Sequence, residues 1–133
     1  MIDAENAIFT KIATALRTAY PGIEVLGRTI FAPSVFPCVC IEEADNYSFR
    51  KTRDTGSNEN HVQVMYEVNV YSNKEAGAKS ECKEIFSTID SIMDGLGFTR
   101  TSKIPVDMDD ATKYRLNGRY QAVIGADKTI YRR

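Results

Sequence analysis

Alternating apolar and polar residues predict a strand near the middle of the chain. The apolar positions are every second residue, namely Val62, Val64, Tyr66, Val68 and Val70. Gln63, Glu67 and Asn69 alternate with them, and Met65 is the only large apolar side chain in that second set. Successive side chains of a strand point to opposite faces, so this segment is expected to bury one face and expose the other.

A helical repeat follows the strand. Apolar residues recur there at spacings of three and four, which predicts an amphipathic helix with one buried stripe. The residues expected on that stripe are Ala78, Cys82, Ile85, Phe86, Ile89, Ile92, Met93 and Leu96. Ser72 and Glu75 form the S-x-x-E pattern of a capping box, which predicts the start of the helix. Gly95 and Gly97 are expected to end it.

The remaining elements are read in the same way. An amphipathic helix is expected over the apolar positions of 8–20, opened by Asp3 as a candidate cap. The expected strands are 23–26, 39–43, 98–103, 112–125 and a brief final strand ending at 131–133. Gly118 is expected to mark a bend or bulge. Two exposed polar loops are expected, at 44–60 and 104–111.

This order of elements predicts an α+β fold. The sequence α-β-β-β-α-β-β suggests a mainly antiparallel or mixed sheet with two α-helices packed on one face. With 133 residues, 43% hydrophobic and 26% charged, the chain is expected to form a single domain, 1–133. Residues 1–6 lack the features of a signal peptide, and no apolar run reaches the roughly 18 residues of a membrane span. A soluble protein made in a cytoplasm is expected.

The formal net charge is -1. Domains whose whole surface binds nucleic acid usually carry a marked basic excess, so this balance argues against that class and leaves room only for a local patch. One such patch combines aromatic and basic side chains that could contact phosphate: Tyr47, Phe49, Arg50, Lys51 and Arg53. A charged loop that stays solvated is the simpler interpretation.

The three cysteines and the single histidine could in principle form a zinc site from Cys38, Cys40, Cys82 and His61. The spacing argues against it, because Cys38 and Cys40 are two residues apart in an expected strand. Structural zinc sites favour knuckles with longer spacing and a matching second pair. Reduced cysteines in the core are therefore expected. His61 lacks a neighbouring nucleophile motif and is not expected to be catalytic.

The acidic residues Asp107, Asp109 and Asp110 suggest a further alternative. Together with Glu42 or Glu43 they could form a two-metal site of a small metal-dependent nuclease or hydrolase. The segment lacks the glycine and the distal glutamate of a calcium loop. A solvated loop, or a loop that contacts another subunit, is the preferred interpretation, and neither catalytic residues nor a cofactor or bound metal is expected.

Four segments carry a resemblance to a known family. They are Val64 to Asn73, the helix Lys83 to Met93, the exit Gly97 to Arg100, and the late strand Tyr114 to Tyr120. In this order they resemble the small tail-terminator or tail-completion proteins of tailed bacteriophages, also described as head–tail joining or minor structural components. The expected first helix and the strand after Pro37 also fall where that family places them.

The resemblance implies a non-enzymatic assembly protein of the virion. Proteins of that family are small α+β domains that form rings, commonly hexameric, at the head-proximal end of a tail. The implied partners are further copies of the chain, the tail tube protein and the head–tail connector proteins, with non-specific contact to passing DNA and none to a membrane. Assembly would take place in the bacterial host cytoplasm. The candidate contact residues are Tyr47, Phe49, Arg50, Lys51, Arg53, Asp107, Asp109 and Asp110.

Three other functions remain open at this point. The first is another ring component at the same head–tail junction, which the sequence does not separate from a terminator. The second is the metal-dependent nuclease with its acidic loop. The third is a host-encoded binding module, which would be favoured by a monomer with a concave apolar pocket.

Overall fold

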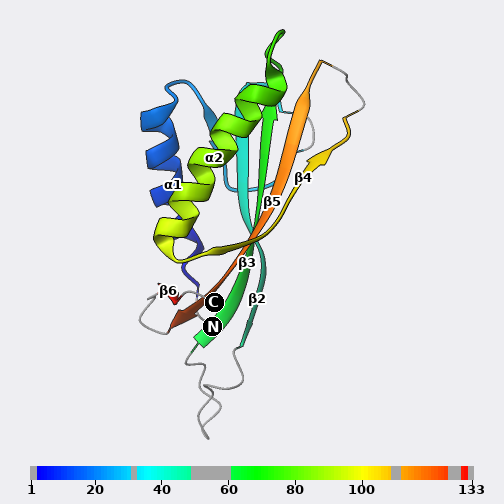
Figure 1. Cartoon of the computed structure of the whole chain (residues 1–133). Coiled ribbons are helices and arrows are strands. Elements are labelled where there is room, and N and C mark those ends of the chain that lie inside the picture. The colour runs from blue at the N-terminus through cyan, green and yellow to red at the C-terminus, as the bar shows by residue number, and fades with distance from the viewer. Residues whose placement is uncertain (1–2, 31–32, 49–60, 109–111, 126–129, 132–133) are drawn as a thin grey trace, which may run out of the picture.

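The structure is a computed structural model that describes residues 3–30, 33–48, 61–108, 112–125 and 130–131. Its elements are α1 (Glu5–Ala19), β1 (Glu24–Leu26), β2 (Cys38–Ser48), β3 (His61–Ser72), α2 (Ala78–Leu96), β4 (Thr99–Val106), β5 (Tyr114–Gly125) and β6 (Ile130–Tyr131). The strand order is β1-β2-β3-β5-β4, and β6 pairs with the end of β5. Only β1 and β2 run parallel, and both helices cover the same face of the sheet (Figure 1). The predicted α+β fold is confirmed.

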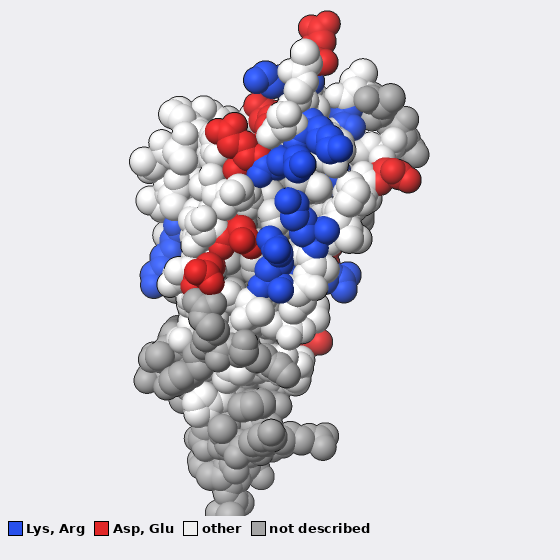
Figure 2. All heavy atoms as spheres, in the orientation of Figure 1, with Lys and Arg blue, Asp and Glu red and all other residues white. Residues whose placement is uncertain are grey.

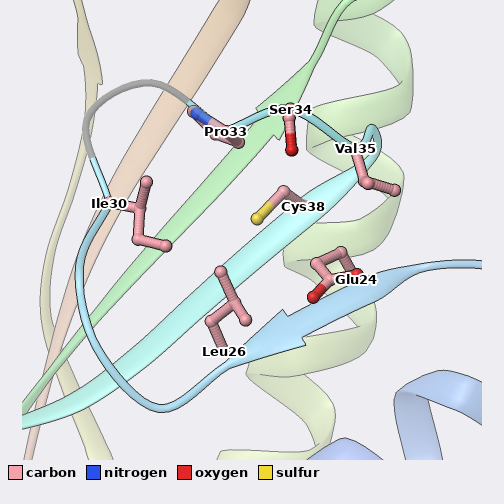
Figure 3. A pocket seen from close by; sticks show the side chains of 7 residues that line it. All are labelled: Glu24, Leu26, Ile30, Pro33, Ser34, Val35 and Cys38. Carbon is pink, nitrogen blue, oxygen red and sulfur yellow. The ribbon is translucent and has the colours of Figure 1, made fainter.

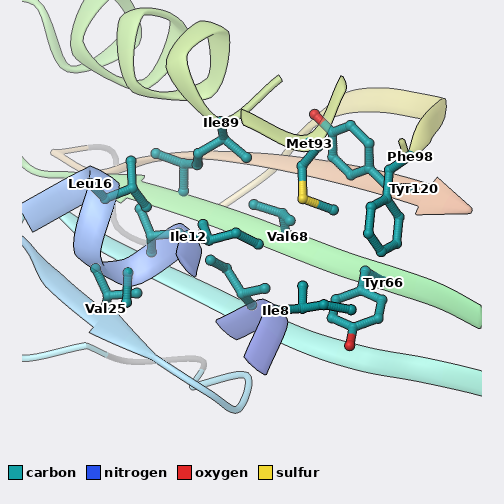
Figure 4. Close-up of a cluster of buried hydrophobic side chains, with 14 of the residues drawn as sticks. Ile8, Ile12, Leu16, Val25, Tyr66, Val68, Ile89, Met93, Phe98 and Tyr120 are labelled. Carbon is teal, nitrogen blue, oxygen red and sulfur yellow. The ribbon is translucent and has the colours of Figure 1, made fainter. Parts of the chain in front are cut away.

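The main core lies between the two helices and the sheet (Figure 4). The five alternating apolar residues of β3 are all fully buried on this side. They meet Ile8, Ile12 and Leu16 of α1, together with a stripe of α2 formed by Cys82, Ile85, Phe86, Ile89 and Met93. Ile92 and Leu96 lie at the margin of this core and are only half-buried. Each large apolar side chain that is fully buried contributes about 1.5–3 kcal/mol, so this layer dominates the stability of the fold.

Two strands are longer than the apolar pattern predicts. β2 continues to Ser48, pairing with β3 through a bulge between Glu43 and Asp45, so the expected loop was wrong for residues 44–48. β4 continues through Val106, so the expected loop at 104–111 was also wrong at its start. Both extensions lie at sheet edges, where polar residues and a proline are tolerated because part of the backbone has no strand partner.

The predicted capping box at the start of α2 was wrong. Ser72 is the last residue of β3, paired with Tyr114, and its hydroxyl lies 2.5 Å from a carboxylate oxygen of Glu81. Glu75 is exposed, and the helix begins after Gly77, which has φ +101°. The chain needs residues 73–77 to leave the sheet and reverse direction, so the helix starts later than the motif suggests.

α2 ends at Gly97, as the sequence predicts. The amide of Gly97 donates to the carbonyl of Asp94 at 3.0 Å, and the amide of Phe98 donates to the carbonyl of Met93 at 2.9 Å. These two bonds form a Schellman motif, which favours glycine at the residue with positive φ, here +99°. Gly95, by contrast, lies inside the helix and does not end it.

Gly118 does not produce the expected bend or bulge. It stays in regular register between Val68 of β3 and Lys103 of β4, and the irregularity lies in β4, between Arg100 and Ser102. A Cβ atom at residue 118 would lie 2.3 Å from Cζ of Phe86. Glycine is therefore required here by the close approach of the aromatic ring of α2.

Neither helix, within the part of the chain that the structure describes, is long and apolar enough to cross a membrane.

Candidate functional site

The two sides of the sheet carry opposite charge. The acidic residues of β1 and β2 are Glu24, Glu42, Glu43 and Asp45, and these two strands contain no Lys or Arg. The basic residues of β4 and β5 are Arg100, Lys103, Arg115 and Arg119, and these two strands contain no Asp or Glu. β3 separates the two groups in the strand order. Charge is therefore separated among these four strands, a pattern that the net charge of -1 does not show.

The acidic side is an accessible edge. β1 pairs only with Cys38–Cys40, so from Ile41 onward β2 is itself the edge among the strands that the structure describes. Glu42 and Asp45 lie on the face of the sheet without helices, opposite Glu67 and Met65 of β3. Glu43 points to the helix-bearing face, where it meets the first turn of α1. Acidic side chains thus line both faces of this edge.

The basic side is the β4 edge, whereas the neighbouring α2 carries both Lys79 and Lys83 and the acidic residues Glu81, Glu84, Asp90 and Asp94. Lys103 is exposed and its Nζ lies 5.3 Å from the centroid of the Phe86 ring, while Arg100 forms a 3.3 Å ion pair with Asp90. Lys79 and Lys83 are exposed on α2. Figure 2 shows Lys and Arg side chains gathered beside α2, with Asp and Glu side chains next to them. This edge can attract an acidic surface.

The helix-free face of β3 and β5 carries a network of polar side chains. Asn117 donates to Glu67 at 2.9 Å and to Asn69 at 3.0 Å, and Nε of Arg115 donates to the same oxygen of Asn69 at 3.0 Å. The prediction that β3 exposes this face was wrong at Gln63 and Asn69, which are both buried although no helix covers the face. Arg119 lies 3.9 Å from Glu67. The network holds the side chains of Arg115, Arg119 and Glu67 against the sheet, so this face has an ordered polar surface.

A small pocket of about 230 Å³ opens on the same face beside β1 (Figure 3). Leu26, Ile30, Pro33 and Val35 give it apolar walls. Its polar groups come from Glu24, Ser34 and Cys38. The pKa of Cys38 is raised mainly by a hydrogen bond with the side chain of Cys40 and, to a smaller extent, by burial. Since the thiolate is the reactive form of cysteine, the pocket does not present an activated nucleophile.

A cluster of three carboxylates lies where α1 meets β2. Oxygens of Asp3, Glu5 and Glu43 all lie within 4.8 Å of one another. The amide of Glu5 donates to Asp3 at 3.1 Å, and the amide of Glu43 donates to Glu5 at 2.9 Å. Burial, and then the charges of nearby carboxylates, raise the pKa of Glu43. The prediction of Asp3 as the cap of this helix was wrong: the N-cap residue is Ala4, without a side-chain cap, and Asp3 precedes it and accepts from the amide of Glu5. Asp3 instead belongs to a cluster that no sequence motif indicates.

The two candidate contact residues that the structure describes, Tyr47 and Asp107, lie far apart. Tyr47 is 45% exposed on the helix-free face of β2, and Asp107 is exposed directly after β4. Tyr47 pairs with Gln63 of β3, which pairs with Val123 of β5, so Tyr47 lies at the level of Val123. Val106, the residue before Asp107, pairs with Arg115 at the other end of β5. Eight residues of β5 separate these levels, about 27 Å. The other candidates, Phe49, Arg50, Lys51, Arg53, Asp109 and Asp110, lie outside the described residues.

The acidic set of the nuclease alternative is not brought together by the described residues. Glu42 and Glu43 point to opposite faces of β2. Asp107 lies about five residues along the sheet and three strands across from Glu42, or about 22 Å away. Ligands of one cation lie within about 2.6 Å of it, so these carboxylates cannot share a metal site.

The three cysteines and His61 also do not come together in the structure. Cys82 packs in the main core, while Cys38 and Cys40 lie on the helix-free side with Tyr71. His61 is at the opposite end of β3 from Tyr71, the partner of Cys38, about 33 Å away. All three thiols are free and buried, which agrees with the expected core role and excludes a shared zinc ion.

Two features escaped the reasoning from sequence. The separation of charge is visible in the sequence, because no Lys or Arg occurs between Arg28 and Arg50 and no Asp or Glu occurs between Asp94 and Asp107, but the net charge conceals it. The three-carboxylate cluster joins residues about 40 positions apart, and only the pairing of α1 with β2 reveals it. Within the described residues, these two features are the most distinctive of the surface.

No protein-family model matches the chain, and no curated protein matches its sequence.

Proposed function

We propose that this protein is a tail-terminator or tail-completion protein of a tailed bacteriophage, acting as a ring of identical subunits that caps the tail tube and joins it to the head connector. The proposal joins the resemblance of the chain to that family with one observation of its surface. That observation is the opposite charge of the two sheet edges.

Opposite edges suit a closed ring. In a ring, each subunit contacts its neighbours through two different patches, so one patch must be complementary to the other. The acidic edge of β2 and the basic edge of β4 lie on either side of the sheet and meet this requirement within a single chain. Complementary charge guides association and sets the orientation of the partners.

The test is the mass of the purified full chain by light scattering over a range of concentrations, followed by electron microscopy of the large species and of tail tubes assembled with and without the protein. A discrete ring that binds one end of the tubes and limits their length supports the proposal. A ring that binds the connector but not the tubes would indicate the alternative junction component. A protein that stays monomeric even with the tube protein present would overturn it.

A further inference from the structure

The three-carboxylate cluster has the dimensions of a cation site. Two ligand oxygens on opposite sides of a Ca²⁺ ion lie about 4.6–5.2 Å apart, because each is about 2.3–2.6 Å from the ion. The oxygens of Asp3, Glu5 and Glu43 already lie within 4.8 Å of one another. Two backbone amides and the side chain of Asn46 hold these carboxylates by hydrogen bonds. The ligands are therefore positioned before any ion binds.

A buried hydroxyl provides a second and independent observation. Tyr66 is fully buried and its hydroxyl has no hydrogen-bond partner in the structure. Tyr66 is the cross-strand partner of Glu43, so both side chains lie on the helix-bearing face at the same level. In Figure 4 the hydroxyl points away from Phe98 and Tyr120, on the side of β2. Burial raises the pKa of Tyr66, and the negative charges of Glu43, Glu5 and Asp3 raise it further.

Such an orphaned group needs an explanation, since buried polar atoms in folded proteins are almost always hydrogen-bonded to protein, water or a ligand of an ion. Water bound to a cation would supply this partner. The ion would also neutralise carboxylates that otherwise repel one another at short distance. One ligand thus satisfies both the hydroxyl and the excess negative charge.

We infer that Asp3, Glu5 and Glu43 bind one divalent cation of the size of Ca²⁺, with the Tyr66 hydroxyl hydrogen-bonded to a water or carboxylate that ligates the ion. Asp3 is exposed while Glu5 and Glu43 are half-buried, so the ion enters from solvent and completes its coordination with water. The site lies within one chain and does not depend on ring assembly.

The experiment uses the full chain and Tb³⁺ as a luminescent substitute for Ca²⁺, with tyrosine as the sensitiser. Emission is expected to saturate at about one ion per chain and to be displaced by Ca²⁺. Glu43→Gln is expected to weaken binding by about tenfold or more, because affinity follows the number of charged ligands. Tyr66→Phe is expected to lose most of the sensitised emission and to weaken Ca²⁺ binding in calorimetry by about tenfold, the usual effect of losing a hydrogen bond to a ligand.

Glu42→Gln is the matched control, since Glu42 is the adjacent half-buried glutamate on the opposite face of β2. Ca²⁺ should raise the melting temperature of the unmodified chain and of Glu42→Gln but not that of Glu43→Gln. Without Ca²⁺, Glu43→Gln should melt no lower than the unmodified chain, because it loses one of three repelling charges; this shows that the variant folds. Absence of saturable Tb³⁺ and Ca²⁺ binding, or equal binding by Glu42→Gln and Glu43→Gln, would overturn the site.

Discussion

Gly118 lies under the ring of Phe86, and the missing side chain at this position is what allows α2 to approach the sheet so closely. Phe86 is 1% exposed and stacks on Tyr120 with ring centroids 6.3 Å apart, so the ring has little space into which it could move. A single atom at residue 118 therefore affects the contact of a whole helix. The apolar pattern of the sequence cannot reveal this, because the pattern only says that a glycine is present.

At this scale we predict that Gly118→Ala lowers the free energy of unfolding by about 1–3 kcal/mol, as overpacking of a core usually does. Gly95→Ala is the matched control, since residue 95 is exposed inside α2 with open space around the position of a Cβ. That variant should gain up to about 1 kcal/mol, because alanine favours helix more than glycine does. Denaturant titration measures both. Equal effects of the two substitutions would mean that Phe86 does not pack over Gly118.

At the scale of elements, the start of α2 distinguishes what the sequence motif implies from what the structure contains. Ser72 is buried and hydrogen-bonded to Glu81, whereas Glu75 is exposed. Ser72→Ala is expected to cost about 1–3 kcal/mol, because it removes a buried hydrogen bond to a charged group. Glu75→Ala should change stability by less than about 0.5 kcal/mol, as exposed substitutions usually do. A capping box would instead make the two losses similar, and thermal unfolding of the two variants separates these outcomes.

The buried stripe of α2 gives a second prediction at this scale. Ile89 is fully buried between α2 and the sheet, so Ile89→Ala should lower the free energy of unfolding by about 2–5 kcal/mol. Ile92 is only half-buried, and Ile92→Ala should cost clearly less. Chemical denaturation followed by circular dichroism measures both. A loss below about 1 kcal/mol for Ile89→Ala would show that the buried face of the helix is assigned incorrectly.

Elements with a strong apolar period could be predicted from the sequence, whereas the far ends of the edge strands β2 and β4 could not. β3, α2 and β5 each repeat apolar residues on one face, and all three occur where the pattern predicts them. The ends of β2 and β4 carry polar residues and Pro105, and their strand pairing depends on backbone partners far along the chain. For the same reason the sequence did not reveal that Glu43 meets Glu5, a contact between residues 38 positions apart.

At the scale of the whole molecule, the charged residues of the strands divide between the two edges of the sheet. In the sheet order β1-β2-β3-β5-β4, the basic residues of β4 and β5 lie on one side of β3, and the acidic residues of β1 and β2 lie on the other. The sheet therefore has an acidic edge on one side and a basic edge on the other. A head-to-tail arrangement of copies would satisfy every edge, whereas an arrangement that pairs two equal edges would bring like charges together.

The opposite charge of the two edges can be tested by mixing two variants. Lys103→Glu makes the basic edge more acidic, and Glu42→Lys makes the acidic edge more basic, so each variant alone should assemble more weakly than the unmodified chain. In an equal mixture of the two, the intact acidic edge of the first meets the intact basic edge of the second, and the two altered edges are also complementary. An alternating ring with an even number of subunits should then form. Light scattering of each variant and of the mixture should show large species mainly in the mixture.

Lys74→Glu is the matched control, since Lys74 is exposed in the turn before α2 and belongs to neither edge. It makes the same change in charge and should assemble as the unmodified chain does. The difference between single variants and mixture should shrink as salt approaches about 1 M, where charges more than about 3 Å apart are screened. If the mixture assembled no better than either variant alone at low salt, the two edges would not face each other, and another pair of surfaces would have to close the ring.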